Sequence, residues 1–202
     1  MASQIKPEEL LDLRGYEALR PRRLAEIIAL KERRRVALGP WVSCVFENRR
    51  TVLHQIQEML RIERLSEPAR IAHEIETYSE LLPQDGELSV TLFIEIADAA
   101  ERRRALSKLG GLEKTLALEL WGGRGMGVER VAAFDKRPID PEIERPGQAT
   151  AVYYLGLRLN AEQRRLFISD APEARLRLSH PVYDHAALLV PALRRELSSD
   201  WG

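Results

Sequence analysis

The sequence predicts an α+β fold, in which a helix-rich N-terminal half packs on a mixed, mainly antiparallel sheet and the C-terminal half is β-rich. Helical periodicity dominates residues 1–111, whereas short strands separated by turns dominate residues 112–202. Helices and strands do not alternate regularly, so the pattern is not that of a doubly wound α/β protein. We expect a single compact domain over residues 1–202, in which 1–111 and 112–202 would be the two lobes.

The first half contains the long helices. Ser66 is the expected cap of one helix, with Pro68 in its first turn, and Asp98 with Glu101 forms a capping box that opens another. Gly39-Pro40 marks a break or bulge inside the first strand. The predicted elements are helix Pro7–Leu13, helix Glu17–Arg35, strand Val36–Phe46, helix Thr51–Leu65, helix Glu67–Leu82 and strand Leu88–Ile96.

Short strands and turns make up the second half. The stretch Arg137–Gly147 is predicted as a long polar loop, and Asn160 with Gln163 caps a short helix. His180 and His185 are assigned to a loop. The predicted elements are strands Thr115–Trp121, Val128–Phe134, Ala151–Leu159 and Ala174–Leu178, and a closing helix Pro191–Ser198.

Composition and charge favour a globular protein of a reducing compartment. The 31 basic and 31 acidic residues cancel, so net charge does not support steering towards nucleic acid or anionic lipid. Cys44, the single cysteine, cannot form an internal disulfide, and its apolar strand favours a small core residue over a nucleophile. No run approaches the roughly 18 apolar residues of a membrane span, and Met1–Lys6 shows no signal segment. We therefore expect a cytoplasmic protein without membrane contact.

Two histidines on neighbouring helices raise a metal-site hypothesis. Helical geometry places His54 and Glu58 together on the outer face of one helix, and His73 and Glu76 on the polar face of the next. The spacing of His73 and Glu76 would let both side chains share a metal. Antiparallel helices meet through their apolar faces, however, so solvated helix surfaces are favoured over a metal centre.

Carboxylates at inward-facing positions raise a second hypothesis. Glu63 falls within the apolar stripe of its helix, where a carboxylate is costly unless a cation such as Arg49 or Arg70 pairs with it. If the two strands of the first half are neighbours, several side chains would converge as an acid–base cluster. A buried ion-pair network is favoured over an active site, and both stay open. The candidate catalytic residues are Glu47, Arg49, Glu63, Tyr78 and Glu95.

Three further motifs are weaker. The Gly122–Gly127 run has the composition of a phosphate loop, but a strand follows it, so a flexible hairpin turn is favoured. The Arg33–Arg35 run is a local basic patch that cations of the preceding helix extend, and a solvated face is favoured over an anionic partner. No cysteine or glycine motif for an iron–sulfur cluster or dinucleotide is present, so no cofactor is predicted.

Six segments of the chain follow a recognisable order: Ile28–Lys31, Phe46–Arg49, Gln55–Met59, Glu74–Tyr78, Glu87-Leu88 and Thr91–Ile96. Together they resemble an uncharacterised bacterial family, domain of unknown function 3501. The similarity extends over nearly the whole chain and is strongest from Phe46 to Ile96. The family has no established activity, so the resemblance implies no catalytic residue. It does imply a context, since such proteins are often encoded beside rubrerythrin-like proteins and iron–sulfur oxidoreductases.

These observations lead to three functional hypotheses. The leading one is an accessory or interaction protein of a cytoplasmic redox or oxidative-stress module, with a rubrerythrin-like or iron–sulfur protein as its partner. The alternative is an enzyme or metal-binding protein with a glutamate-centred site. Nucleic-acid binding through Arg33–Arg35 is the third, and it would show steep salt dependence.

Overall fold

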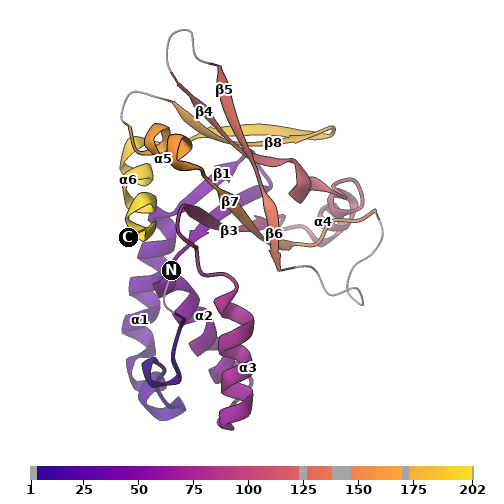
Figure 1. Cartoon of the computed structure of the whole chain (residues 1–202). Helices are drawn as coiled ribbons and strands as arrows, with labels where there is room; N and C mark the ends of the chain where they lie inside the picture. Colours follow the sequence, from indigo (N-terminus) through magenta and orange to yellow (C-terminus); the bar gives the residue numbers. More distant parts are fainter. Residues whose placement is uncertain (1–3, 123–126, 138–146, 170–172, 202) are drawn as a thin grey trace.

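Two antiparallel sheets and a stalk of three helices form the molecule (Figure 1). The structure is a computed structural model that describes residues 4–122, 127–137, 147–169 and 173–201. We call the sheet with strand order β1-β2-β3-β7-β6 sheet A and the one with order β5-β4-β8-β9 sheet B. The α+β prediction is confirmed. The strands are β1 (Arg35–Leu38), β2 (Val42–Glu47), β3 (Glu87–Ile94), β4 (Leu116–Trp121), β5 (Val128–Ala132), β6 (Phe134–Arg137), β7 (Val152–Arg158), β8 (Ala174–His180) and β9 (Tyr183–Leu188).

The helices lie outside the two sheets. In Figure 1, α1, α2 and α3 extend from sheet A as the stalk, whereas α5 and α6 lie together at one side of the sheets and α4 lies apart from them. Short 3₁₀ turns occur at Pro7–Glu9, Leu112–Thr115 and Ser199–Trp201. The α-helices are α1 (Leu13–Arg33), α2 (Arg49–Ile62), α3 (Pro68–Ser79), α4 (Ala99–Leu106), α5 (Ala161–Ile168) and α6 (Pro191–Ser198).

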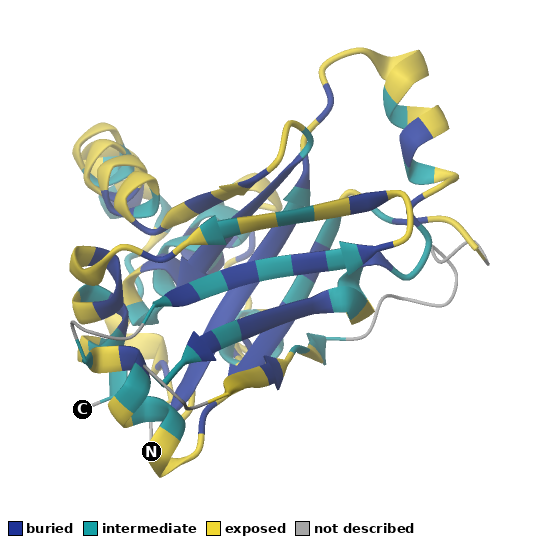
Figure 2. Cartoon of the chain, turned by 90° about the horizontal axis from the view of Figure 1, so that it is seen from above, coloured by how far each residue is buried: buried dark blue, intermediate teal, exposed yellow. Residues whose placement is uncertain are grey.

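The main hydrophobic core lies between the two sheets. Burial alternates along β8, where Leu176 and Leu178 point inward, and the same alternation is visible in Figure 2. Leu92 of β3 and Leu118 of β4 belong to this core, so strands from both halves of the sequence share it. Cys44 lies there as well, as predicted, and burial raises the pKa of its thiol.

A second, smaller core joins the stalk to the rest of the molecule. Val52, Ile56 and Leu60 of α2 pack with Ile75 of α3, and Tyr154 of β7 contacts the same group. The stripe of α2 therefore faces α3 and the lower part of sheet A, as an amphipathic helix requires. The opposite side of α2 contacts α1.

Several predicted boundaries need correction. The predicted strand Val36–Phe46 is a hairpin, because Gly39 adopts φ +76° and reverses the chain between β1 and β2. The loop expected around His180 and His185 is the β8–β9 hairpin, whose edge strand β9 has one inward-facing side and was missed. The cap expected at Ser66 is wrong, since α3 begins at Pro68 with Glu67 as its N-cap. Most of the Gly122–Gly127 turn and of the Arg137–Gly147 loop lies outside the described residues.

Other terminal signals are confirmed. The Asn160 side chain accepts a hydrogen bond from the Gln163 N–H, and the Asn160 N–H donates one to the Gln163 side-chain oxygen, which is the predicted capping box of α5. At the start of α4, Asp98 is the N-cap and its side chain accepts from the Glu101 N–H, which is one of the two hydrogen bonds of the predicted capping box. The closing helix is α6, with the predicted bounds. Among the described residues, no helix combines the length and the apolar character needed to cross a membrane.

Candidate functional site

The predicted acid–base cluster does not assemble, although its two strands are neighbours. In the β2–β3 register Glu47 lies opposite Ser89, whereas Glu95 follows Ile94, which pairs with Val42. The two glutamates are therefore at opposite ends of the strand pair, about 20 Å apart at ~3.3 Å per residue. The expectation of convergence is wrong, because shared strand faces do not imply a shared end.

The other members of that cluster have separate partners. Glu63 is exposed, because α2 ends at Ile62 and Glu63 caps it, and its carboxylate lies 3.8 Å from Arg70. Its predicted place in an apolar stripe is therefore wrong. Arg49 forms an ion pair with Glu9 at 2.6 Å. Glu95 is exposed and binds Arg35 at 3.0 Å and the Ser43 hydroxyl.

Glu47 and Tyr78 come nearest to the expected arrangement. Glu47 is buried, accepts a hydrogen bond from Thr91 at 2.7 Å, and lines a cavity of about 130 Å³ beside Tyr154. Burial raises the pKa of Tyr154, so its hydroxyl stays protonated at neutral pH. Tyr78 is buried next to this region, with the Arg137 guanidinium 5.5 Å from its ring centre. The cavity has room for only a few water molecules.

The histidine pairs of the metal hypothesis point in different directions. His54 and Glu58 contact α1, so the prediction that they form a solvated outer face is wrong: α1 covers that face of α2. His73 and Glu76 are exposed on α3. Within the described residues, no group of three or more His, Cys, Asp or Glu side chains is arranged to hold a metal ion.

Glu58 is the centre of a polar cluster between α1 and α2. Arg20 donates two hydrogen bonds to its carboxylate, at 2.8 and 3.0 Å, and Tyr16 donates one at 2.6 Å. Arg61 adds a contact at 3.2 Å from the same helix. The Arg20 hydrogen bonds, helped by those from Tyr16 and Arg61, lower the pKa of Glu58 to about 2. Glu58 is therefore a fixed anion whose charge is already neutralised.

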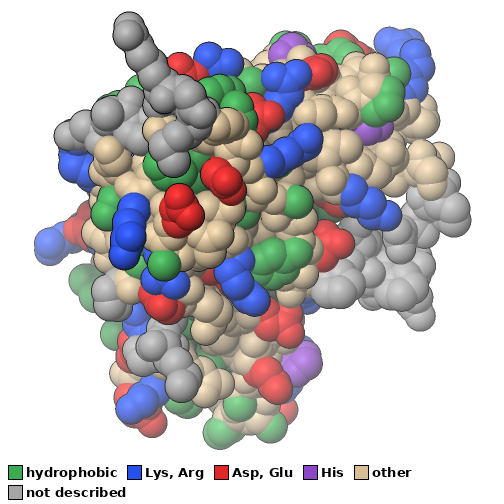
Figure 3. Space-filling view, turned by 45° about the horizontal axis from the view of Figure 1, so that its top comes forward, with side chains coloured by type: hydrophobic (Ala, Val, Ile, Leu, Met, Phe, Trp, Pro, Cys, Tyr) green, Lys and Arg blue, Asp and Glu red, His purple; other side chains and the backbone are tan. Residues whose placement is uncertain are grey.

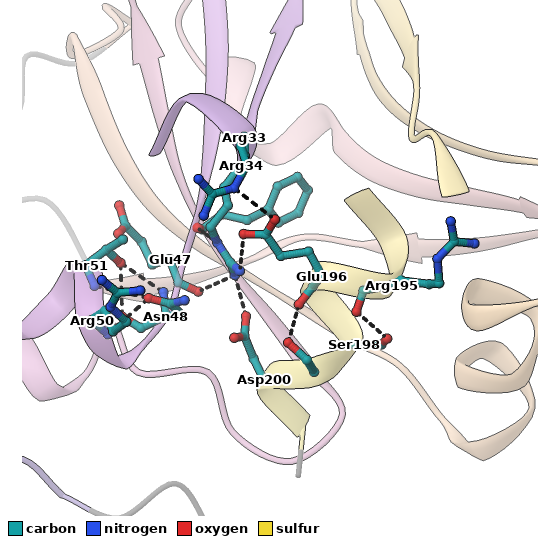
Figure 4. Close-up of polar contacts among 12 residues, drawn as sticks. Arg33, Arg34, Glu47, Asn48, Arg50, Thr51, Arg195, Glu196, Ser198 and Asp200 are labelled. Carbon is teal, nitrogen blue, oxygen red and sulfur yellow. Dashed lines mark hydrogen bonds and ion pairs between the residues drawn. The ribbon is translucent and has the colours of Figure 1, made fainter. Parts of the chain in front are cut away.

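The basic patch predicted at Arg33–Arg35 is not a continuous surface, because Arg34 is 1% exposed. Figure 4 shows its guanidinium between the β2 end and the C-terminal helix. Arg34 donates to the Phe46 carbonyl at 2.8 Å, binds the Asp200 carboxylate and lies 3.5 Å from Glu196. We call this group the Arg34 lock, since it ties residues 196–200 to the start of sheet A.

A cavity of about 470 Å³ lies beside α4. We call it the α4 groove. Trp41 forms one wall and stacks on Tyr183, with ring centres 5.5 Å apart and an interplanar angle of 16°. Val182, at the tip of the β8–β9 hairpin, is 59% exposed. The remaining lining residues are Glu101, Arg104, Ala105, Lys108 and Leu109.

Cations at the α4 groove lack acidic partners. Arg103, Arg104 and Lys108 are exposed, and none forms a salt bridge to any residue that the structure describes. Elsewhere the charges are mixed, and Figure 3 shows basic and acidic side chains interspersed over one face of the molecule. The groove thus combines apolar walls with a local excess of positive charge.

Sequence patterns alone did not identify Tyr16, Arg20 or Trp41. Tyr16 and Arg20 are spaced i,i+4 on α1, as His54 and Glu58 are on α2, so two matched pairs meet across the helix interface. That matching spacing was a usable signal. The groove had a weaker signal, since Trp41 follows directly on Gly39-Pro40, inside the predicted strand Val36–Phe46.

Comparison with known proteins identifies the family without assigning an activity. Among solved structures, the chain is similar to a novel protein of unknown function from Burkholderia pseudomallei K96243, with a TM-score of 0.86 and 28% sequence identity. That match covers 99% of this chain and 100% of the other. No curated protein matches the chain significantly. The model of the family described as protein of unknown function (DUF3501) matches residues 4–201. The chain belongs to the DUF3501 family.

Proposed function

We propose that this protein is an accessory or interaction protein that binds a partner protein through the α4 groove. The observation that carries the proposal is the combination, at one place, of a cavity of about 470 Å³, an aromatic wall and cations that form no salt bridge to a described residue. Protein interfaces are enriched in tryptophan, tyrosine and arginine, and their strongest contacts are aromatic side chains in desolvated pockets. Trp41 is held in position by its stack on Tyr183, so little ordering is needed on binding.

The charge of the groove favours an acidic partner segment. Arg104 and Lys108 line it directly and Arg103 lies beside them on α4, against one acid, Glu101. An apolar side chain of the partner would contact Trp41 and Val182, and carboxylates around it would meet the cations. The partner we propose is a rubrerythrin-like or iron–sulfur protein of a bacterial cytoplasmic redox module, and this identity rests on the context that the family resemblance implies.

The glutamate-centred enzyme has less support. Its five candidate residues occupy different places, and each has a nearby structural contact. The cavity beside Glu47 is about 130 Å³, below the roughly 300–1,000 Å³ of drug-sized ligand sites.

Comparative co-purification from the native host tests the proposed interaction. Tagged wild type is compared with the double variant Val182→Asp plus Arg104→Glu and with a control double variant, Ile28→Asp plus Arg70→Glu. The control makes the same chemical changes at exposed positions of the stalk. A rubrerythrin-like or iron–sulfur protein should be enriched with wild type and control, and depleted about tenfold or more with the groove variant.

Two results would contradict the proposal. Equal enrichment with wild type and groove variant would place the interface elsewhere on the molecule. Absence of specific enrichment over a tag-only sample, with all three proteins folded by circular dichroism, would remove the support for an interaction role.

A further inference from the structure

Another cavity, of about 220 Å³, lies between α1 and α2. These two helices belong to the stalk, and α4 lies apart from them (Figure 1). Residues of both helices line it, and it is small by the standard of drug-sized ligand sites, so it selects a small ligand. We call it the His54 pocket. Its lining residues are Tyr16, Arg23, Glu26, Ile27, Arg50, Leu53, His54 and Gln57.

The hydrogen bonds at the pocket define which nitrogen of His54 carries a proton. Tyr16 has one hydroxyl proton and donates it to Glu58 at 2.6 Å. The Tyr16 oxygen also lies 3.3 Å from His54 Nδ1, so this nitrogen must be the donor of that contact. The neutral imidazole therefore has its proton on Nδ1 and a free lone pair on Nε2.

His54 remains neutral at ordinary pH. Burial lowers the pKa of the imidazole, and the cations Lys31, Arg20 and Arg23 lower it further against the opposing effect of Glu58. His54 Nε2 has no hydrogen-bond partner among the described residues and is not among the buried atoms that lack one, so it reaches open space. The pocket thus contains an accessible hydrogen-bond acceptor.

The pocket also contains a cation, Arg23, that forms no ion pair with a described residue. Arg23 is half-buried and forms no hydrogen bond or ion pair with any residue that the structure describes. The neighbouring cation Arg20 forms an ion pair with Glu58, and Arg50 lies 3.9 Å from Glu26. Gln57 is also engaged, because its amide binds both the N–H and the carbonyl of Leu11. Two polar groups of the pocket have no hydrogen-bond or ion-pair partner among the described residues, and these are the Arg23 guanidinium and His54 Nε2.

These two groups bind different chemical groups of one ligand. The guanidinium takes an oxyanion, whereas the Nε2 lone pair repels an oxyanion unless the ligand supplies a proton. We propose that the His54 pocket binds a small oxyanion that also carries a hydroxyl group, with Arg23 holding the charged oxygens and His54 Nε2 accepting the hydroxyl hydrogen bond. Hydrogen phosphate and small hydroxycarboxylates both have this chemistry. Tyr16 is a positioning residue, since it orients the imidazole without touching the ligand.

Matched probes test the requirement for a hydroxyl proton. Inorganic phosphate and sulfate have similar size and shape, but near about pH 8 only phosphate retains a proton to donate, while His54 stays neutral. Glycolate and acetate differ in the same way, by one hydroxyl. Titrations followed by NMR of the His54 imidazole should show saturable shifts with phosphate or glycolate, at least about tenfold tighter than with sulfate or acetate. Tighter binding of phosphate than of glycolate identifies a phosphate site, and the reverse identifies a hydroxycarboxylate site.

Variants then connect the binding to the two named groups. Arg23→Gln should weaken phosphate and glycolate binding about tenfold or more, whereas Arg14→Gln, the same change at an exposed position of α1, should not alter it. Tyr16→Phe should change the ¹⁵N shifts that report the His54 tautomer. The proposal is overturned if none of the four probes gives a saturable shift in the folded wild type, if sulfate binds as tightly as phosphate, or if Arg23→Gln binds like wild type.

Discussion

Arg34 and Arg23 come from the same N-terminal helical region, yet their surroundings differ in one decisive respect. Arg34 is fully buried, and its guanidinium is matched by the Phe46 carbonyl, Asp200 and Glu196. Arg23 is half-buried beside a cavity and has no partner among the described residues. A saturated buried cation stabilises the fold, whereas an unmatched cation beside a cavity is available to a ligand. The comparison therefore separates structural arginines from candidate binding arginines.

The largest expected effect is that of Arg34→Gln. The change would leave buried acceptors at Phe46 and Asp200 without their donor, so the free energy of unfolding should fall by about 3–5 kcal/mol. Burial already raises the pKa of Asp200 against the opposing effect of Arg34, so the pKa of its carboxyl group should rise further in the variant. Urea denaturation measures the loss. Arg23→Gln is the matched control and should change stability by less than about 0.5 kcal/mol. Similar losses of stability in Arg34→Gln and Arg23→Gln would contradict the distinction between the two arginines.

Glu58→Gln should have an intermediate and pH-dependent effect. The pKa of Glu58 is lowered from 4.5 to about 2 in the folded protein, so its stabilising contribution is present above pH 4.5 and is lost as the pH falls from there towards 2. At neutral pH the variant should be less stable by about 1–2 kcal/mol, after allowance for the partial exposure of its arginine partners. Denaturation curves from neutral pH to about pH 3 should show the gap to wild type narrowing.

The control for this pH series is Glu76→Gln, a change at an exposed glutamate of α3. The free energy of unfolding of this control variant should stay close to that of wild type at every pH of the series. If the gap between Glu58→Gln and wild type stayed constant with pH, Glu58 would not be the fixed anion that its hydrogen bonds from Arg20, Tyr16 and Arg61 imply.

The smallest expected effect is that of Glu95→Gln. Glu95 is exposed, and its ion pair with Arg35 at 3.0 Å is solvated, so the variant should lose at most about 0.5 kcal/mol. Thermal denaturation at low and high salt checks this, with little difference expected between the two conditions. A loss above about 2 kcal/mol would show that the Ser43–Glu95–Arg35 contacts resemble the Arg34 lock.

Local signals predicted much of the fold. Alternation in residues 88–96 and the caps at Asp98 and Asn160 depend on neighbouring residues alone, and the corresponding elements are present. The prediction was wrong where the end of a helix, or another helix packed over a surface, decided whether a side chain is buried. Glu63 lies just beyond the end of α2, so its side chain is exposed and does not lie in the apolar stripe of the helix.

The candidate sites were predicted less well, because they depend on which helix faces pair. The sequence placed His54 and Glu58 side by side correctly, since i,i+4 spacing on a helix requires it. It could not show that α1 would cover them with Tyr16 and Arg20, because nothing local to α2 records its neighbour. The α4 groove likewise brings together Trp41, Arg104 and Val182 from three distant segments.

The sequence by itself determined the fold class, most helix starts and the balance of charge, because periodicity, capping and composition act over a few residues. Only the tertiary structure decided which charges are matched. Arg34 is matched because residues 196–200 return to it, whereas the acids near Arg23 pair with other arginines, Glu58 with Arg20 and Glu26 with Arg22. The physical reason is that the partner of a charged side chain is set by long-range packing, which brings residues together regardless of their separation along the chain.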